Sequence, residues 1–238
     1  DNNGNIVYEE KKITDTSQEI QEKIELNKLG EEDTIIEITV TAEKQEIQKT
    51  YKIHIKRPYG KIKGKIQLGN GLKESMDGSY GIKMNYVADL RIYKQDLINW
   101  DDIIQGNLSL DDVDSEQTEK TTKSDDEGNY EIYVIPGKYD FYAERQGFLA
   151  DITTKITINE NDEIDLGTKI LYEGDADRSG IIDLNDTIEI VNSMGASKGD
   201  STYSEKYDFG QKGYVSLDDM VSVVGNLYKT IKIKKYTG

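Results

Sequence analysis

The 238-residue sequence has no cysteine and only one histidine. The absence of cysteine excludes disulfides, thiolate metal sites and cysteine nucleophiles. A single imidazole disfavours Ser-His-Asp triads and zinc sites that need several histidines. That histidine, His54, lies in an alternating run between Tyr51 and Lys56 and shares its polar side with two lysines. We therefore expect it to be a solvent-exposed strand residue.

Basic residues are scarce and long apolar runs are missing. Acidic residues outnumber basic ones 46 to 30, which gives a net charge of −16. Nucleic acid is therefore an unfavourable partner, because phosphate contacts need a basic face. No apolar run approaches the length of a membrane-spanning helix, and the N-terminus lacks the pattern of a signal peptide. Because the sequence starts at Asp1 rather than methionine, we expect a piece of a longer protein.

The first two thirds of the sequence has the two-residue period of β-strands. Residues 34–40 and 51–56 alternate apolar and polar residues, which predicts a hairpin with one buried face. Arg57-Pro58 breaks this pattern. Short strand-like runs with Gly, Asn and Pro turns then continue to Leu171, which is typical of a β-sandwich. Within them, the acidic residues 94–119 are expected to form a loop with one short helix near residues 100–105.

The period becomes helical after Gly174. Apolar residues recur at helical spacing in two segments about 33 residues apart: Leu184, Ile188 and Val191, then Leu217, Val221 and Val224. The predicted fold is mainly β, with two tandem β-sandwich modules followed by a small α-helical calcium-loop domain. We place the modules at residues 1–57, 58–172 and 173–238. The alternating tail, residues 230–236, is expected either to pair with a sheet edge near residues 169–172 or to be disordered.

The segment between the sandwich and the first helix has the donor spacing of a calcium loop. Counted from Asp175 as position 1, its oxygen donors fall at positions 1, 3, 5, 7, 9 and 12: Asp175, Asp177, Ser179, the backbone carbonyl of Ile181, Asp183 and Asp186. Gly180 stands at position 6, where the chain turns sharply. The oxygens favour calcium, because magnesium prefers a smaller octahedral cage. The alternative is an Asp-rich turn in which Asp183 caps the helix.

The second segment repeats this loop with fewer donors. Asp208, the carbonyl of Tyr214, Ser216 and Asp219 keep positions 1, 7, 9 and 12, whereas position 5 is Lys212. We expect a weak or lost metal site here. Our hypothesis is that the ammonium group of Lys212 replaces calcium as the counter-charge for Asp208 and Asp219.

Two such segments, each with Asp at position 12 and preceded by a strand-like entry, resemble a type I dockerin. The resemblance covers Tyr172 to about Tyr228, a quarter of the chain. It implies that the module binds a cohesin domain of another protein. It also implies that loop positions 10 and 11 contact this partner: Leu184 and Asn185 in the first segment, Leu217 and Asp218 in the second. Both leucines also belong to the apolar helix stripe, so a core role is equally open for them.

Two further resemblances concern the β region. The motifs Lys61-Ile-Lys-Gly-Lys-Ile-Gln67, Thr122 to Tyr130 and Ile135-Pro-Gly-Lys-Tyr139 resemble the carboxypeptidase-regulatory-like β-sandwich. That family implies a spacer or stabilising module without catalytic residues. The first 57 residues resemble the second half of a cadherin-like sandwich of bacterial surface proteins, through the runs that begin at Glu37 and Thr50.

The leading interpretation is a non-catalytic, calcium-dependent docking protein that ends a larger secreted or cell-surface bacterial protein, as in polysaccharide-degrading assemblies. Acidic pairs such as Asp101-Asp102 are interpreted as solvated loops rather than catalytic carboxylates. Two alternatives remain: a self-contained structural or adhesive scaffold, and a carbohydrate-binding accessory module with Trp100 as the candidate aromatic. The docking interpretation requires the surface around Leu184, Asn185, Leu217 and Asp218 to be exposed, whereas the scaffold interpretation requires the sandwich to cover it.

Overall fold

A computed structural model describes residues 26–31, 33–41, 48–69, 85–105, 107 and 118–237. The chain divides into two compact units between Ile55 and Lys56. Each unit is described by itself below. Among the described residues, no helix is both long and apolar enough to cross a membrane.

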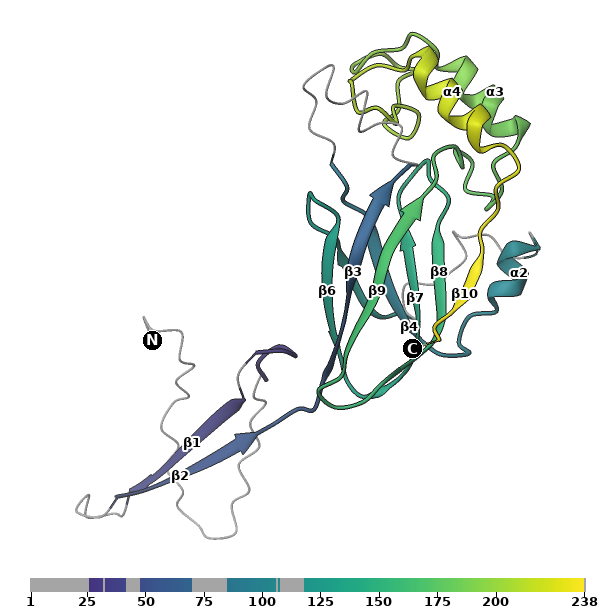
Figure 1. The fold of residues 1–238 in the computed structure, drawn as a ribbon. Coiled ribbons are helices and arrows are strands. Elements are labelled where there is room, and N and C mark those ends of the chain that lie inside the picture. Colours follow the sequence, from purple (N-terminus) through teal and green to yellow (C-terminus); the bar gives the residue numbers. More distant parts are fainter. Residues whose placement is uncertain are drawn as a thin grey trace. The chain divides into compact units, whose positions relative to one another are not determined.

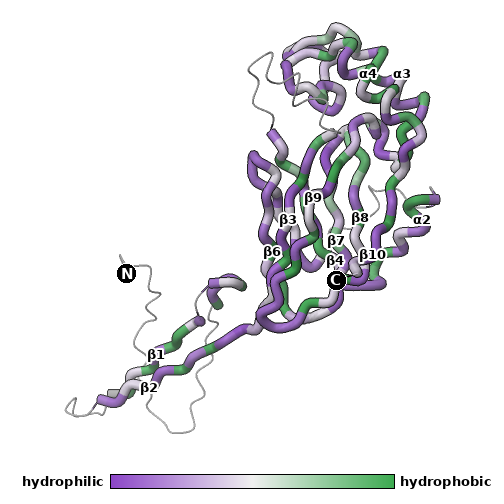
Figure 2. The backbone as a smooth tube through the Cα atoms, in the orientation of Figure 1, coloured by the Kyte–Doolittle hydropathy of each residue, from purple (hydrophilic) through white to green (hydrophobic). Residues whose placement is uncertain are grey.

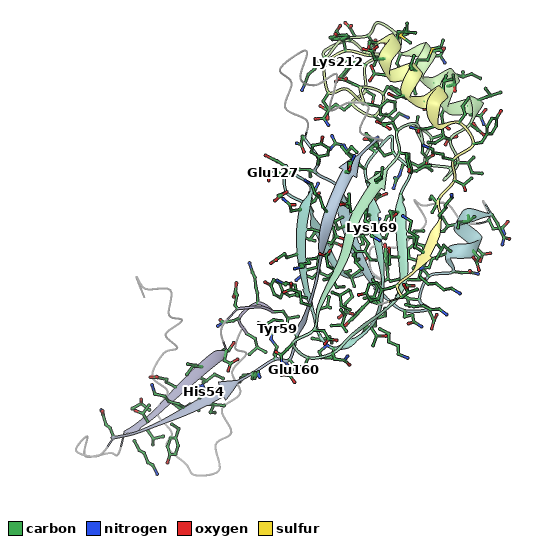
Figure 3. The ribbon with its side chains drawn as sticks, viewed as in Figure 1. His54, Tyr59, Glu127, Glu160, Lys169 and Lys212 are labelled. Carbon is green, nitrogen blue, oxygen red and sulfur yellow. The ribbon has the colours of Figure 1, made fainter. Side chains whose placement is uncertain are left out.

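The first unit contains an antiparallel hairpin of β1 (Thr34–Thr41) and β2 (Gln48–Ile55), with Thr34 opposite Ile55. The predicted hairpin is therefore confirmed, and its β-branched residues favour strand geometry. The face expected to be buried runs through Ile36, Ile38 and Val40, and this expectation is wrong for the described residues: Ile38 and Val40 are exposed and Ile36 is only half-buried. His54 is exposed on β2, as expected (Figure 3).

The second unit contains two facing sheets, which form a β-sandwich (Figure 1). The larger sheet has the order β10-β8-β7-β4-β5 and the smaller sheet the order β6-β3-β9. The larger sheet comprises β4 (Asp89–Lys94), β5 (Thr118–Lys123), β7 (Gly137–Glu144), β8 (Asp151–Ile158) and β10 (Ile233–Lys235). The smaller sheet comprises β3 (Gly60–Leu68), β6 (Asn129–Val134) and β9 (Glu163–Leu171).

The core between the sheets follows from the alternation along each strand (Figure 2). On β6, for example, Tyr130, Ile132 and Val134 are buried and the residues between them point outward. The ring of Tyr130 stacks on that of Phe141 of β7 with centroids 5.2 Å apart. The predicted mainly-β sandwich is confirmed for this unit.

The apolar core extends to the short helix α2 (Trp100–Ile104), whose buried residues Trp100 and Ile103 belong to it. Trp100 is only 5% exposed, stacks on Tyr142 and donates from Nε1 to the buried carboxylate of Asp140 at 2.8 Å. The predicted helix is confirmed. Because the indole is enclosed by the sheet, Trp100 does not offer a face to a sugar, so this aromatic does not support the carbohydrate-binding alternative.

Two features of the sandwich differ from the sequence-based expectation. Residues 118–123 form the edge strand β5, although the acidic loop was expected to extend to residue 119. The tail is ordered, but β10 pairs in parallel with β8, with Ile233 opposite Ile152, and not with residues 169–172. The tail therefore covers the other free edge of the larger sheet.

The predicted helices are present as α3 (Leu184–Asn192) and α4 (Leu217–Asn226), which contact each other at one end of the sandwich (Figure 1). Each helix buries one large apolar residue, Ile190 or Val223. Sandwich and helices share one continuous core, and Phe148 packs edge-to-face against Phe209 of the helical segment at 5.4 Å. Residues 173–237 thus pack against the sandwich through shared core residues.

The burial of Trp100 leads to a stability prediction. Trp100→Ala is expected to lower the free energy of unfolding by roughly 3–5 kcal/mol, because it leaves a cavity under α2 and removes the donor to Asp140. Urea unfolding followed by circular dichroism measures this. The control is Leu97→Ala in the same segment, where the side chain is 46% exposed and the expected change is within about 0.5 kcal/mol. Equal losses of unfolding free energy in the two variants would contradict the conclusion that Trp100 anchors α2 to the larger sheet.

Candidate calcium loop and exposed helix face

The first loop, residues 175–186, connects the end of the sandwich to α3. Asp183 caps α3, and Asp186 completes a capping box by accepting from the backbone of Asp183. Gly180 has a φ of 82° and turns the chain at the centre of the loop. The loop conformation is therefore encoded by the capping box at its end and the glycine at its middle.

Three carboxylates converge in this loop. Asp175, Asp177 and Asp186 each offer an oxygen, and the three oxygens lie within 4.8 Å of one another. Asp175 and Asp186 are fully buried. In the part of the chain that the structure describes, no lysine or arginine forms an ion pair with any of the three. Buried carboxylates without a cation are energetically costly, so this cluster calls for a positive charge.

Backbone donors orient the two buried carboxylates. Asp186 accepts from the N–H groups of Ala176 at 2.7 Å and Asp183 at 2.8 Å, and Asp175 accepts from that of Gly180 at 3.1 Å. Burial, followed by the charge of Asp186, nevertheless raises the pKa of Asp175 to about 8. Burial also raises the pKa of Asp186, despite its hydrogen bonds. The N–H groups therefore aim the oxygens without neutralising them.

Two further predicted donors adjoin the cluster. The hydroxyl of Ser179 donates to the carbonyl of Ile181 at 3.1 Å, which brings loop positions 5 and 7 together. Ile181 pairs with Thr230 of the tail, and the bonds of this bridge use the carbonyl of Gly180 and the N–H of Ile182. The carbonyl of Ile181 is not used in that pairing, so it remains available on the loop side.

The remaining predicted donor, Asp183, has the capping role that the sequence left as an alternative. Its carboxylate accepts from the N–H of Asn185 at 2.7 Å, and it lies outside the group of converging oxygens. In calcium loops the residue at position 9 often reaches the ion through a water molecule. Capping and a water-mediated contact are therefore compatible, and the all-oxygen donor set fits a hard cation such as calcium.

The two buried carboxylates of the second loop, Asp208 and Asp219, accept hydrogen bonds from loop N–H groups and from neighbouring hydroxyl groups. Asp208 accepts from the N–H of Gly213 at 2.7 Å and from the hydroxyl of Tyr203 at 3.0 Å. Asp219 accepts from the N–H and the hydroxyl of Ser216 at 2.9 and 2.8 Å. Tyr214 pairs with Ser197 in the linker, much as Ile181 pairs with the tail. No third carboxylate joins Asp208 and Asp219 among the described residues.

The hypothesis for Lys212 needs correction. Its ammonium group lies 2.7 Å from the carboxylate of Asp218 and 3.4 Å from the hydroxyl of Ser216, at the end of the unit that carries the helices (Figure 3). Burial lowers the pKa of Lys212. Asp218 and, to a lesser extent, Asp219 raise this pKa by more than burial lowers it, so the net shift is upward. The direct partner is thus Asp218 at position 11, rather than the two loop-end carboxylates.

The apolar stripe of the two helices is exposed. The side chains of Leu184 and Leu217 are 61% and 63% exposed, and Asn185 and Asp218 are exposed as well. The alternative core role for the two leucines is therefore wrong. We define the apolar helix face by the six large apolar side chains that α3 and α4 leave exposed: Leu184, Ile188, Val191, Leu217, Val221 and Val224.

An exposed apolar face of this kind is typical of an interaction site. Leu184 and Leu217 were predicted by number as partner-binding residues, whereas Ile188, Val191, Val221 and Val224 were not. Their helical spacing carried the signal, because all six residues repeat with the same period. What the spacing did not show is that α3 turns Asp186 and Ile190, rather than this stripe, toward the core.

Comparisons with known proteins give limited help. No protein-family description matches the chain, and no curated protein matches it. Among solved structures, it is similar to two interface mutants of a type II cohesin-X-dockerin complex from Acetivibrio cellulolyticus. The matched chains are 19% and 18% identical, with TM-scores of 0.48 and 0.47, and each match covers 72% of this chain and 97% of the other.

The Bacillus anthracis TIE protein is another similar structure, 15% identical, with a TM-score of 0.28 over 52% of this chain and 21% of the other. Similarity at these levels supports no conclusion about function. It does not identify the helical segment as a dockerin, and the β-sandwich stands on the sheets themselves.

The buried carboxylates predict a pH dependence for the metal-free protein. The pKa of Asp175 is about 8 in the folded chain against a usual value of 3.8, so between these values the folded state holds a proton that the unfolded state has lost. Stability must then fall as pH rises through this window. Asp175→Asn removes the titrating group, and its melting temperature in chelator should exceed that of the wild type at pH 8 and depend less on pH.

Calorimetry in chelator across this pH window measures the two slopes. Asp183→Asn is the matched control, because asparagine is as good a cap as aspartate and the residue lies outside the buried cluster. Its slope should equal that of the wild type. A wild-type slope no steeper than that of Asp175→Asn would show that the carboxylate is not costly to bury.

Proposed function

We propose that the chain is a non-catalytic docking protein whose helical segment is dockerin-like and binds a cohesin-like domain of another protein in a calcium-dependent manner. The observation that supports this most strongly is the exposed apolar helix face next to a loop of converging oxygens. Neither feature serves the sandwich core. A secreted or cell-surface location, with polysaccharide contacted through other modules, is part of the same proposal.

The first loop is the proposed calcium site. Asp175, Asp177, Ser179, the carbonyl of Ile181 and Asp186 would hold the ion, with Asp183 contributing through water. The ion supplies the positive charge that the buried carboxylates lack. With free calcium at about 100 times the dissociation constant, this binding stabilises the folded chain by roughly 2.7 kcal/mol. The second loop is proposed to be weak or lost as a metal site, because among the described residues no third carboxylate joins Asp208 and Asp219.

Calcium dependence follows from shared residues. Asp186 is the last donor of the loop and also lies in the first turn of α3, two residues after Leu184. Without a cation, Asp175 and Asp186 repel each other when both are ionised, and this repulsion acts directly on the turn because Asp186 completes the capping box. The ordering of the loop and the ordering of the first turn of α3, where the apolar helix face begins, are therefore coupled.

The apolar helix face has the chemistry of an interface core. Fully burying a leucine, isoleucine or valine contributes about 1.5–3 kcal/mol, so a partner that covers several of these six side chains gains substantial affinity. Asn185 and Asp218 lie next to the two leucines and offer polar contacts at the rim. Figure 1 shows both helices together at one end of the sandwich, where a partner can reach them.

Other functions have less support. A self-contained scaffold would use the sandwich to cover the apolar helix face, and the face is exposed. The carbohydrate-binding alternative loses its best candidate with the burial of Trp100. The two cohesin-X-dockerin complexes to which the chain is similar contain both sides of a docking pair. A cohesin-like role, in which the sandwich receives the partner, is therefore the competing outcome that the docking test must separate.

Calcium titration tests the metal proposal. Isothermal titration calorimetry of the full chain should show one tight calcium ion, because among the described residues three carboxylates come together only in the first loop. Asp177→Ala should weaken binding at least tenfold by removing an exposed donor, which otherwise accepts a hydrogen bond from the N–H of Ser179 within the loop. Asp218→Ala, in the second loop, is the control and should leave the affinity unchanged. Two tight ions would contradict the loss of the second site.

Variants of the apolar helix face test the docking proposal. Leu184→Asp or Leu217→Asp should weaken binding to purified cohesin domains by more than about tenfold, since truncating an interface anchor typically costs over 1 kcal/mol. Leu97→Asp is the matched control, because Leu97 is also an exposed leucine, 46% exposed, but lies near α2. Biolayer interferometry with and without calcium measures all three.

The same experiment separates a cohesin-like role. Lys63→Glu and Glu131→Lys reverse charges on the outer side of the smaller sheet. If these two variants lose binding to purified dockerins while the helix variants keep it, the sandwich is the docking element. The proposal that the helical segment binds the partner would then be overturned.

A further inference from the structure

The two loops share an unusual backbone conformation at position 4. Arg178 and Gln211 have φ angles of 61° and 54°, in the left-handed region that residues with a Cβ rarely adopt. Arg178 stands between Asp177 and Ser179, two of the proposed calcium donors. A backbone in a disfavoured region persists only where surrounding contacts hold it. The contacts of these two side chains are therefore informative.

Both side chains attach their loop to the sandwich. The guanidinium group of Arg178 lies 2.6 Å from the carboxylate of Glu144, the last residue of β7. Gln211 accepts from the N–H of Asn85 and donates to its carbonyl, both at 2.9 Å. The residue types and partners differ between the two loops, but the attached position is the same. Attachment through position 4 is thus a repeated feature of this chain.

Glu144 is itself held by the larger sheet. Its Oε1 lies 2.6 Å from the guanidinium group of Arg91 on β4. The hydroxyl of Tyr142 donates at 2.9 Å to Oε2, the same oxygen that pairs with Arg178. Glu144 is buried, as is Tyr142. Because two groups of the sheet restrain Glu144, its contact ties Arg178 to a rigid part of the fold. A partly buried, charge-assisted contact of this length is stronger than an exposed ion pair.

We infer that Glu144 positions the first loop for calcium by holding Arg178 in its left-handed conformation. The inference rests on the proposed calcium site and adds to it that the sandwich contributes to metal affinity without touching the ion. With Arg178 held, Asp177 and Ser179 are positioned near Asp175 and Asp186 before the metal binds. The loop therefore loses less conformational entropy when it binds the metal. Glu144 is a positioning residue, and the sandwich is more than a spacer.

Calcium affinity of the full chain tests the inference. Isothermal titration calorimetry with calcium chloride should show about tenfold weaker binding for Glu144→Gln, the usual loss for a residue that supports a metal ligand. Arg178→Gln should lose the same factor. The double variant should lose no more than the weaker-binding single one, since both substitutions break the same contact between Arg178 and Glu144. Arg178 lies on the loop and is partly exposed, so Arg178→Gln keeps the test valid if Glu144→Gln fails to fold.

Two control variants separate positioning from general stability. Glu163→Gln makes the same chemical change on the same sandwich at a carboxylate that also pairs with two cations, Lys61 and Lys63, and does not contact the loops. Gln211→Ala removes the attachment of the second loop only. Neither control should change calcium affinity, although both can change the melting temperature.

The outcomes are distinct. If the wild type binds calcium and Glu144→Gln binds it equally well, the positioning role is overturned and the calcium site stands. If Glu163→Gln weakens binding as much as Glu144→Gln, the effect is one of stability and the positioning role is again overturned. If the wild type binds no calcium, the proposed site fails and the inference fails with it.

Discussion

The burial of two neighbouring carboxylates, Asp175 and Asp186, is the constraint on which the helical segment depends. Their positions are fixed by hydrogen bonds to backbone N–H groups, so they cannot turn away from each other into solvent. Asp186 also completes the cap of α3. The start of this helix, the direction of its apolar side chains and the pairing of the tail with Ile181 all follow from the same loop.

Sandwich and helical segment act as one folding unit. The edge-to-face contact of Phe148 with Phe209 continues the apolar core across the junction. At Gly147, with a φ of 83°, a Cβ would lie 2.2 Å from the carbonyl oxygen of Lys206, so only glycine allows this approach. Lys229 places its ammonium group 3.6 Å from the ring centre of Tyr172. A residue substitution at this junction therefore affects both parts.

The sequence predicted the elements better than their partners. Alternation identified most of the strands, because residues such as Ile132 and Val134 must face a core. The edge strand β5 escaped, since its threonine, lysine and glutamate residues show no apolar alternation. The tail was recognised as a strand, but its pairing with β8 depends on which sheet edge is open, and only the assembled topology decides that.

The candidate site shows the same division. Donor spacing placed Asp175, Asp177 and Asp186 together correctly, because position in a loop this short determines proximity. Spacing also revealed that each helix has an apolar stripe. Periodicity alone cannot show whether such a stripe is buried in the core or exposed to solvent. The contact of Arg178 with Glu144 joins residues 34 positions apart in sequence and left no local signal.

The bare stripe has a colloidal consequence. Two copies of the chain present the same six apolar side chains to each other, and the gain from covering them is available to a second copy as well as to a partner. The net charge of −16 opposes such pairing through mutual repulsion. Salt screens this repulsion over a Debye length of about 8 Å at physiological ionic strength, while leaving the apolar attraction intact. Low ionic strength therefore opposes self-association of the chain through the apolar helix face, and high ionic strength favours it.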